Sequence, residues 1–175
     1  MSQTEIINRI ALSPLVTFDL ADHHDAAERI GIDIAEQLFM GQILREKDFR
    51  AFIKDTDWTQ YAGKHVHFFC SVDAVIPGWT WMLLSIALEP HAKTVLMGSA
   101  LDLEKEIWRK ILDGLDYGEL TDKKIVVKGC GDIQIPDATY VDFIRRLRPI
   151  ADKLMYGEPC STVPLYRKPK PRRKK

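Results

Sequence analysis

An internal repeat is the sequence feature that most constrains what this chain can fold into. Residues 57–98 align with residues 116–157 at a constant offset of 59 positions and without a gap. Ten of the 42 aligned positions are identical, including Pro77 and Pro136 in the middle of the two copies. A repeat of this length predicts a duplicated supersecondary unit, so we expect much of the chain to be built from two copies of one motif.

Both copies have the pattern of a strand, a loop, a helix and a second strand. The apolar run of the second copy, Ile125 to Val127, does not alternate with polar residues, which is expected of a strand covered on both faces. Strands that alternate with helices predict a mainly parallel sheet. The predicted strand, helix and strand span 64–69, 78–88 and 93–97 in the first copy, and 123–128, 137–147 and 152–156 in the second.

The segment before the repeat predicts an addition to the edge of this sheet. Residues 15–20 and 30–34 each alternate apolar and polar side chains, as half-buried strands do. We therefore expect an α/β fold: a mainly parallel sheet built from an internally duplicated β-α-β unit, with an N-terminal antiparallel hairpin at the edge. The length favours a single domain over residues 1–166. Further helices are predicted over 4–12, 47–54 and 101–112, the last with a capping box formed by Ser99 and Asp102.

Composition favours a soluble cytoplasmic protein. The chain has 175 residues, of which 46% are hydrophobic and 29% charged, as in ordinary globular proteins. No apolar run reaches the roughly 18 residues that a membrane helix needs, and the N-terminus lacks the basic-then-apolar order of a secretory signal. Three cysteines, an odd number, fit a reducing compartment better than a set of disulfides.

Charge is unevenly distributed along the chain. Residues 167–175 carry seven of the 25 lysines and arginines and no acidic residue. Removing those seven leaves 18 basic against 25 acidic residues, a net charge of −7 for the rest of the chain. We expect the basic, proline-containing tail to be disordered. Nucleic acid is not an expected partner, because the body would repel a polyanion and no aromatic residues are interspersed in the tail.

The helix of the first copy predicts a protein partner. Its sequence from Trp79 to Leu88 is apolar on every side, whereas the helix of the second copy has a polar face. A helix without a polar face lies in the middle of a core or is covered by a partner. We expect a homodimer through this helix, with coverage by the N-terminal segment as the alternative.

The three cysteines predict a binding site. Cys70, Cys130 and Cys160 each follow a predicted strand, and the first two loops also carry the repeated Asp73 and Asp132. Loops at the carboxyl ends of parallel strands meet at one edge of a sheet, where ligands gather. Thiolates completed by a carboxylate would suit zinc or an iron–sulfur cluster as the cofactor. The candidate ligand-binding residues are Cys70, Ser71, Asp73, Cys130, Asp132, Glu158, Cys160 and Ser161.

Two other interpretations of the cysteines stay open. Cys130 or Cys160 could act as a nucleophile beside Asp132 or Glu158, in a thiol-dependent enzyme. Alternatively, the cysteines are structural, and the chain is a binding or assembly module without chemistry. No Walker loop, GxGxxG, HExxH or GxSxG motif is present to name a reaction.

Three segments, LREKDF, KGCGD and MYGEPCSTVP, resemble a family of bacterial proteins known only as a domain of unknown function. The resemblance covers residues 8–168, almost the whole chain except the basic tail. MYGEPCSTVP is its most specific segment. The family has no established activity, so the resemblance implies a kind of protein and no particular reaction.

Overall fold

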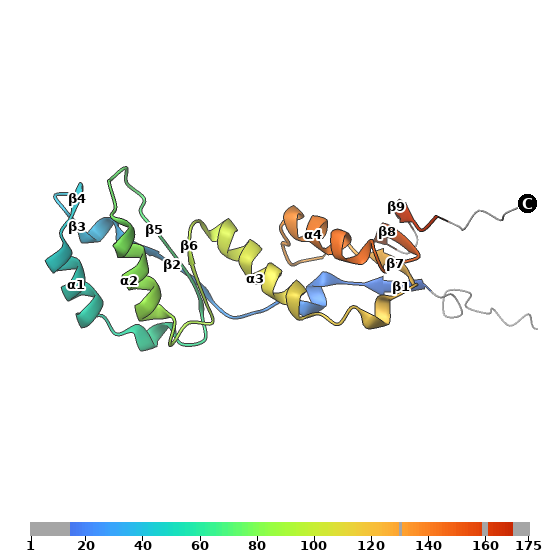
Figure 1. The fold of residues 1–175 in the computed structure, drawn as a ribbon, viewed down its shortest axis with the longest axis horizontal. Helices are drawn as coiled ribbons and strands as arrows, with labels where there is room; N and C mark the ends of the chain where they lie inside the picture. Colours follow the sequence, from blue (N-terminus) through green and yellow to red (C-terminus); the bar gives the residue numbers. More distant parts are fainter. Residues whose placement is uncertain (1–14, 130, 159–160, 170–175) are drawn as a thin grey trace, which may run out of the picture. The chain divides into compact units, whose positions relative to one another are not determined.

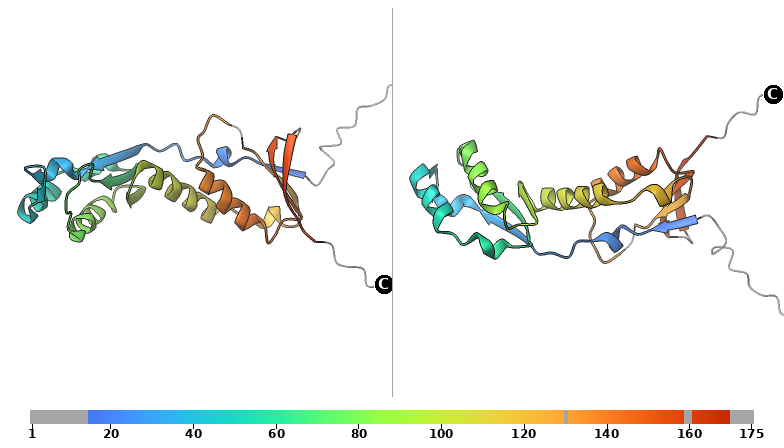
Figure 2. Two further views of the ribbon diagram at one scale, coloured as in Figure 1. Left: turned by 90° about the horizontal axis from the view of Figure 1, so that it is seen from above. Right: turned by 60° about the horizontal axis from the view of Figure 1, so that its bottom comes forward.

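A computed structural model describes residues 15–129, 131–158 and 161–169 of the chain. The chain divides into two compact units, whose elements are labelled in Figure 1 and seen from two further sides in Figure 2. We call residues 25–110 the inserted unit, because they lie within the sequence of the other. We call residues 1–24 together with 111–175 the terminal unit.

The inserted unit is built on a parallel sheet with the strand order β2-β5-β6. Helix α2 connects β5 to β6. Its Leu84 and Leu88 form one core with Val66 and Phe68 of β5, and α1 adds Phe49 to that core. The elements are β2 (Arg29–Asp33), β3 (Leu38–Phe39), β4 (Ile43–Leu44), α1 (Glu46–Asp55), β5 (His65–Phe69), α2 (Gly78–Leu88) and β6 (Thr94–Met97).

The terminal unit is built on a sheet with the strand order β1-β7-β8-β9. The first three strands are parallel, and β9 runs antiparallel to β8 with an irregularity between Leu154 and Met155. Helix α4 connects β7 to β8 and buries Phe143 and Leu147. The elements are β1 (Leu15–Phe18), β7 (Lys124–Val127), α4 (Asp137–Leu147), β8 (Lys153–Glu158) and β9 (Ser161–Arg167), and α3 (Ala100–Gly114) runs from the inserted into the terminal unit.

The two copies of the repeat have matching secondary structure. The helices α2 and α4 begin and end 59 residues apart, and each is preceded by a proline whose carbonyl accepts a hydrogen bond from a threonine N–H. These threonines, Thr80 and Thr139, are buried at 0% and 4% exposure. Proline suits this place because its fixed φ is compatible with entry into a helix and no N–H is lost. The shared residues therefore set where each helix begins and which side it buries.

A second, shorter correspondence links the strands that precede the repeat. β1 pairs in parallel with β7 as β2 pairs in parallel with β5. At the end of each strand an aspartate, Asp19 directly after β1 or Asp33 as the last residue of β2, accepts a hydrogen bond from the N–H two residues later and starts a short 3-10 helix. This similarity between FDLA at 18–21 and IDIA at 32–35 was not predicted from the sequence. Each unit thus has the same parallel three-strand core.

The predicted α/β class and mainly parallel pairing are confirmed, but the two strands assigned to the N-terminal hairpin do not pair with each other. Residues 15–18 and 29–33 lie in different sheets, each in parallel pairing with a strand of the repeat. Alternation shows that one face of a strand is buried, but it carries no information about the partner. The antiparallel pairs are instead β3 with β4 and β8 with β9.

The remaining predicted elements have three outcomes. The helices over 47–54 and 101–112 are α1 and α3, and the predicted capping box is present, with Ser99 and Asp102 exchanging hydrogen bonds of 3.1 and 3.2 Å. The helix over 4–12 lies outside the described residues. Strand β9 is not among the predicted elements; it contains Pro164, which is tolerated in an edge strand such as this one.

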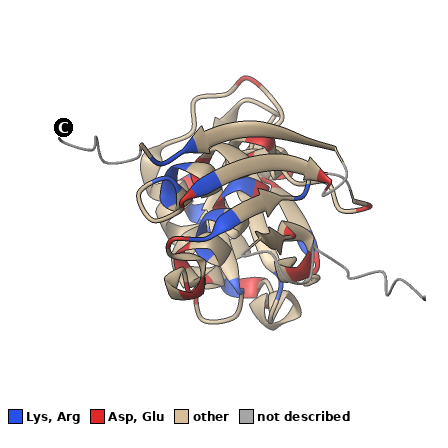
Figure 3. Cartoon of the chain, turned by 90° about the vertical axis from the view of Figure 1, so that its right-hand side faces the viewer, with Lys and Arg blue, Asp and Glu red and all other residues tan. Residues whose placement is uncertain are grey.

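Charged residues of both signs are interspersed along the ribbon (Figure 3). Pairs of them tie neighbouring elements together, as Lys128 does with Asp19 at 2.6 Å and Lys168 with Asp122 at 2.8 Å. Arg167 ends β9, so the described structure continues into the segment predicted as the tail, of which 170–175 lie outside the description. Within the described residues, no helix is long and apolar enough to cross a membrane.

Candidate functional site

The loop after β5 brings three predicted site residues together. Cys70 is half-buried, while Ser71 and Asp73 are exposed. The Ser71 N–H donates to Asp33 Oδ1 at 3.1 Å, which ties this loop to the end of β2. Hydrogen bonding from Ser71 and from the Ala35 N–H lowers the pKa of Asp33. The loop therefore lies at the carboxyl ends of two parallel strands, where a site was predicted.

The other predicted site residues belong to the terminal unit. Asp132 is exposed in the loop after β7, and Glu158 and Ser161 are opposite each other in the β8–β9 pairing. Cys130 and Cys160 lie outside the described residues. Across 15–129, 131–158 and 161–169, no group of three or more histidine, cysteine or acidic side chains is placed to hold a metal ion. The proposal of a site shared by three cysteines thus remains a prediction.

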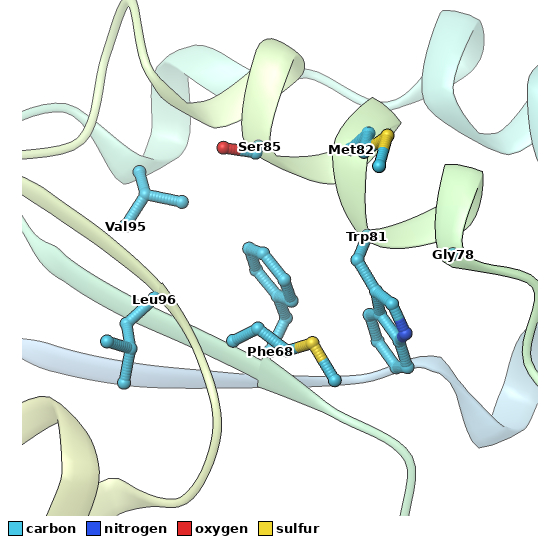
Figure 4. A pocket seen from close by; sticks show the side chains of 8 residues that line it. Phe68, Gly78, Trp81, Met82, Ser85, Val95 and Leu96 are labelled. Carbon is cyan, nitrogen blue, oxygen red and sulfur yellow. The ribbon is translucent and has the colours of Figure 1, made fainter.

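Two pockets of the inserted unit share lining residues and together form a groove along α2 and β6, and Figure 4 shows the first of them. One, of about 420 Å³, lies between α2 and β6, and the other, of about 340 Å³, lies beside the Cys70 loop. Phe68, Trp81 and Met97 line both, and the rings of Phe68 and Trp81 stack with centroids 5.9 Å apart. We call this the α2–β6 groove, lined by Phe68, Phe69, Cys70, Val72, Asp73, Ala74, Ile76, Gly78, Trp81, Met82, Ser85, Val95, Leu96, Met97 and Gly98.

Large apolar side chains are exposed around this groove. Met82 and Ile86, one turn apart on α2, are 66% and 70% exposed, and Met97 at the end of β6 is 57% exposed. The opposite side of α2 is buried through Thr80, Leu84 and Leu88, and α2 contains no charged residue. The predicted apolar helix therefore has one face in the core and another apolar face exposed. An exposed apolar face of this kind is a candidate interaction surface.

Strand β6 is an edge strand of its sheet. In the described part of the chain, its outer edge is therefore unpaired. The Gly98 N–H donates to the Phe68 carbonyl at 3.1 Å, toward β5. Because successive residues of a strand direct their backbone groups to opposite sides, Leu96 also faces β5, and Val95 and Met97 direct their N–H and C=O groups away from it. None of the described strands pairs with β6 on that outer side.

In the terminal unit, the positions that correspond to the α2–β6 groove and to the outer edge of β6 are both covered. Tyr156 stands where the inserted unit has Met97, and Gly129 stands where it has Cys70. The Tyr156 ring lies directly over Gly129, since a Cβ built on that glycine would be 2.1 Å from Cζ of the ring. Tyr140, the counterpart of Trp81, meets Tyr156 edge-on at 5.7 Å. Strand β9 covers the edge of β8 that corresponds to the open edge of β6.

Comparison with known families accounts for nearly the whole chain. Residues 4–168 match the family described as "Protein of unknown function (DUF2480)". The chain belongs to this family. The match includes all of residues 8–168, so the predicted resemblance to a family of unknown function is confirmed, and membership in the DUF2480 family brings no reaction with it. No similar protein was found among the curated proteins, and no solved structure was found to match.

The groove and the open edge were not predicted for this DUF2480 member, although the sequence contained a signal for both. Cys70 opposite Gly129 and Met97 opposite Tyr156 are differences between two otherwise similar copies. The segment 161–167 comes after the second copy as β9, whereas the helix α3 comes after the first. A comparison of these two succeeding segments would have indicated that only one sheet gains an added strand.

Two histidines of β5 are packed within the inserted unit. His67 Nδ1 is 2.9 Å from the Gly98 carbonyl oxygen, and its ring stacks on Phe69 at 5.3 Å. His65 is 2% exposed, and its Nε2 lies 3.1 Å from Asp25 Oδ2, which Lys93 also approaches at 2.6 Å. Burial lowers the pKa of His65 against the attraction of Asp25. Burial would raise the pKa of Asp25, but Lys93, the Ala27 N–H and His65 lower it to about 2.

Proposed function

We propose that this chain is a binding and assembly module that forms a homodimer through helix α2 and the α2–β6 groove in the cytoplasm. The observation that carries the proposal is the exposure of Met82, Ile86 and Met97 around a groove whose helix has no charged residue. In a monomer these three side chains leave apolar surface in contact with water, so their exposure does not stabilise the fold.

The gain from covering these side chains is large enough to drive association. Fully burying a methionine or isoleucine side chain contributes about 1.5–3 kcal/mol. The three side chains are more than half exposed, and each is present twice in a two-fold interface, so the gross gain is roughly 6–12 kcal/mol. Association costs about 4–15 kcal/mol in lost freedom, so further contacts along the groove are needed for a stable dimer.

Light scattering on the purified chain over a range of concentrations tests this proposal. The wild type is expected to have twice the mass of one chain. Met82→Glu should shift it to the monomer, because burying an unpaired carboxylate at an apolar interface is costly. Val141 is the matched control, since it stands at the equivalent position of α4 and is 61% exposed. Val141→Glu should leave the mass unchanged, and a wild type that is monomeric at all concentrations would exclude the proposal.

A second candidate function is the binding of a metal ion or small ligand at the cysteine loops. It is supported by the pocket of about 340 Å³ that half-buried Cys70 and exposed Asp73 both line. Zinc or an iron–sulfur cluster would require Cys130 and Cys160 as further ligands. Metal analysis and an absorption spectrum of anaerobically purified protein test it. Stoichiometric metal that disappears in Cys70→Ser supports this function, and metal content unaffected by all three serine substitutions excludes it.

A further inference from the structure

We propose that β6 pairs edge to edge with β6 of a second copy of this chain, in antiparallel orientation, so that the two inserted-unit sheets become one. This inference rests on the proposed self-association and names its geometry. The joined sheet would have the strand order β2-β5-β6-β6-β5-β2, with the two-fold axis passing beside Leu96. The interface therefore consists of a backbone pairing and of the two α2 helices above it.

The backbone of β6 selects one register for this pairing. Antiparallel strands form their hydrogen bonds between residues that both direct N–H and C=O groups toward the partner. In β6 these residues are Val95 and Met97, because Leu96 and Gly98 face β5. Placing Val95 opposite Met97 of the second copy satisfies both residues on both strands. Leu96 then faces Leu96 of the second copy as a pair without hydrogen bonds between them.

Side chains are compatible with this register. Val95 and Met97 lie on the sheet face covered by α2, where they line the groove together with Phe68 and Trp81. The pairing therefore places apolar side chains opposite apolar side chains on that face. Lys93 lies opposite Ser99 of the second copy, so no like charges meet. An alternative register with Val95 opposite Val95 would put exposed Met97 opposite Lys93.

The spacing of sheets and helices brings the exposed face of α2 against its copy. Neighbouring strands are about 4.8 Å apart. Helix α2 lies over β5 and β6, so it and its two-fold copy would be separated by about two strand spacings, or roughly 10 Å. Packed helices have axes about 8–10 Å apart, so the two helices would touch. Met82 and Ile86 would then be covered by the same contact that pairs the strands.

The terminal unit provides a precedent for an antiparallel strand at this position. Its β8 corresponds to β6, and β9 pairs with it in antiparallel orientation from Lys153 to Glu158. The same kind of core therefore accepts an antiparallel neighbour on this edge. An exposed edge strand is a template for pairing with another chain, which is how sheets of separate molecules join. In the inserted unit a second copy would supply the strand that β9 supplies in the terminal unit.

Disulfide trapping in the full chain tests the register. With Cys70, Cys130 and Cys160 replaced by serine, Leu96→Cys should form a covalent dimer under mild oxidation. Facing residues of a non-hydrogen-bonded antiparallel pair have Cα atoms about 4.5 Å apart, within the range that a disulfide spans. Met155→Cys is the matched control at the equivalent position of β8, which β9 covers, and it should remain monomeric on a non-reducing gel.

A proline substitution provides an independent test of the backbone pairing. Val95→Pro removes an N–H that points away from β5, so circular dichroism should show an unchanged fold while the dimer dissociates at least tenfold more readily. If the wild type is a dimer but Leu96→Cys fails to cross-link and Val95→Pro dimerises normally, edge pairing is wrong and self-association stands. If the wild type is a monomer, the proposed function itself fails.

Discussion

The two units of this DUF2480 protein have the same parallel core and differ in how its open side is completed. In the terminal unit, Tyr156 lies over Gly129, and β9 covers the edge of β8. In the inserted unit Met97 replaces the ring, and none of the described strands covers β6, which leaves a groove and an open edge. The same core can therefore be closed or left open, depending on one residue of the last shared strand, Tyr156 or Met97, and on whether a further strand follows it.

A single missing Cβ explains much of this difference. The Tyr156 ring can lie where it does only because Gly129 has no side chain. In the inserted unit, Cys70 carries the Cβ that Gly129 lacks, so a tyrosine at position 97 could not take the same place over it. Met97 is instead 57% exposed, and the space beside Cys70 stays open as a pocket. The two units should therefore respond differently when equivalent residues are exchanged or removed.

Exchanging one residue between the two helices should abolish the difference in self-association. Ile86→Arg gives α2 the residue that α4 has at the equivalent position, Arg145. Since the change occurs twice in a two-fold interface, we expect dissociation to become easier by about 100-fold, or roughly 2.7 kcal/mol. Analytical ultracentrifugation measures it. Arg145→Ile, the reverse exchange, should not strengthen the dimer, and a dimer strengthened by it would show that the units are not distinguished in this way.

Replacing Gly129 and Tyr156 of the terminal unit by the residues of the inserted unit should remove the ring that covers position 129. Gly129→Cys places a Cβ within the Tyr156 ring and should destabilise the protein by about 1–3 kcal/mol, as overpacking does. Adding Tyr156→Met should recover part of that loss, because the clash is removed. Urea denaturation of both single variants and the double variant gives the coupling free energy. Strictly additive effects would mean that the ring and the glycine do not depend on each other.

The inserted unit should lose stability as the solution becomes acidic. His65 has a pKa below its ordinary value of 6.5, so the unfolded chain binds a proton that the folded chain resists. Stability is therefore complete above about pH 6.5 and falls as the pH is lowered toward the folded pKa of His65. Asp25, with a pKa of about 2, adds a further loss below pH 3.8. Thermal denaturation at pH 7.5 and pH 5.5 measures the first loss, and His65→Phe should reduce it.

The two equivalent aspartates should differ in their response to salt. Asp19→Ala and Asp33→Ala each remove the acceptor at the start of a 3-10 helix and should cost about 1 kcal/mol. Only Asp19 also pairs with a lysine, Lys128 at 2.6 Å, whereas Asp33 accepts from the Ser71 N–H. The loss from Asp19→Ala should therefore shrink in 1 M sodium chloride, as surface ion pairs do, while the loss from Asp33→Ala stays constant. Equal salt responses would contradict the different pairing.

Much of the fold could be predicted because the relevant signals are local. The elements of both repeat copies, helix α1 and the Ser99–Asp102 capping box follow from apolar spacing, proline positions and side chains that bond to nearby backbone. The partners of β1 and β2 could not be predicted in this way. Their alternation is the same whether the neighbouring strand is parallel or antiparallel, and near or far along the chain.

The position of the candidate site could be predicted from the sequence, but the apolar nature of its surroundings could not. The Cys70 loop lies at the carboxyl ends of parallel strands, as its position after an apolar strand indicated. Its surroundings are an apolar groove, because Trp81 and Met97 approach it from elements that follow it by 11 and 27 residues. Trp81 and Met97 meet beside this loop only because α2 crosses over from β5 to β6. No residue spacing in the sequence predicts that contact.

Two properties of this protein are already present in its amino-acid sequence: two similar segments that each have the pattern of a β-α-β motif, and a helix sequence that is apolar on every side. They depend on residue identity and periodicity, which remain the same in any arrangement of the chain. The tertiary structure adds that the copies belong to two separate sheets, that β9 covers one of them and that no described strand covers β6. Strand pairing is a long-range choice, settled by which backbone groups and apolar faces meet after the chain has folded back on itself.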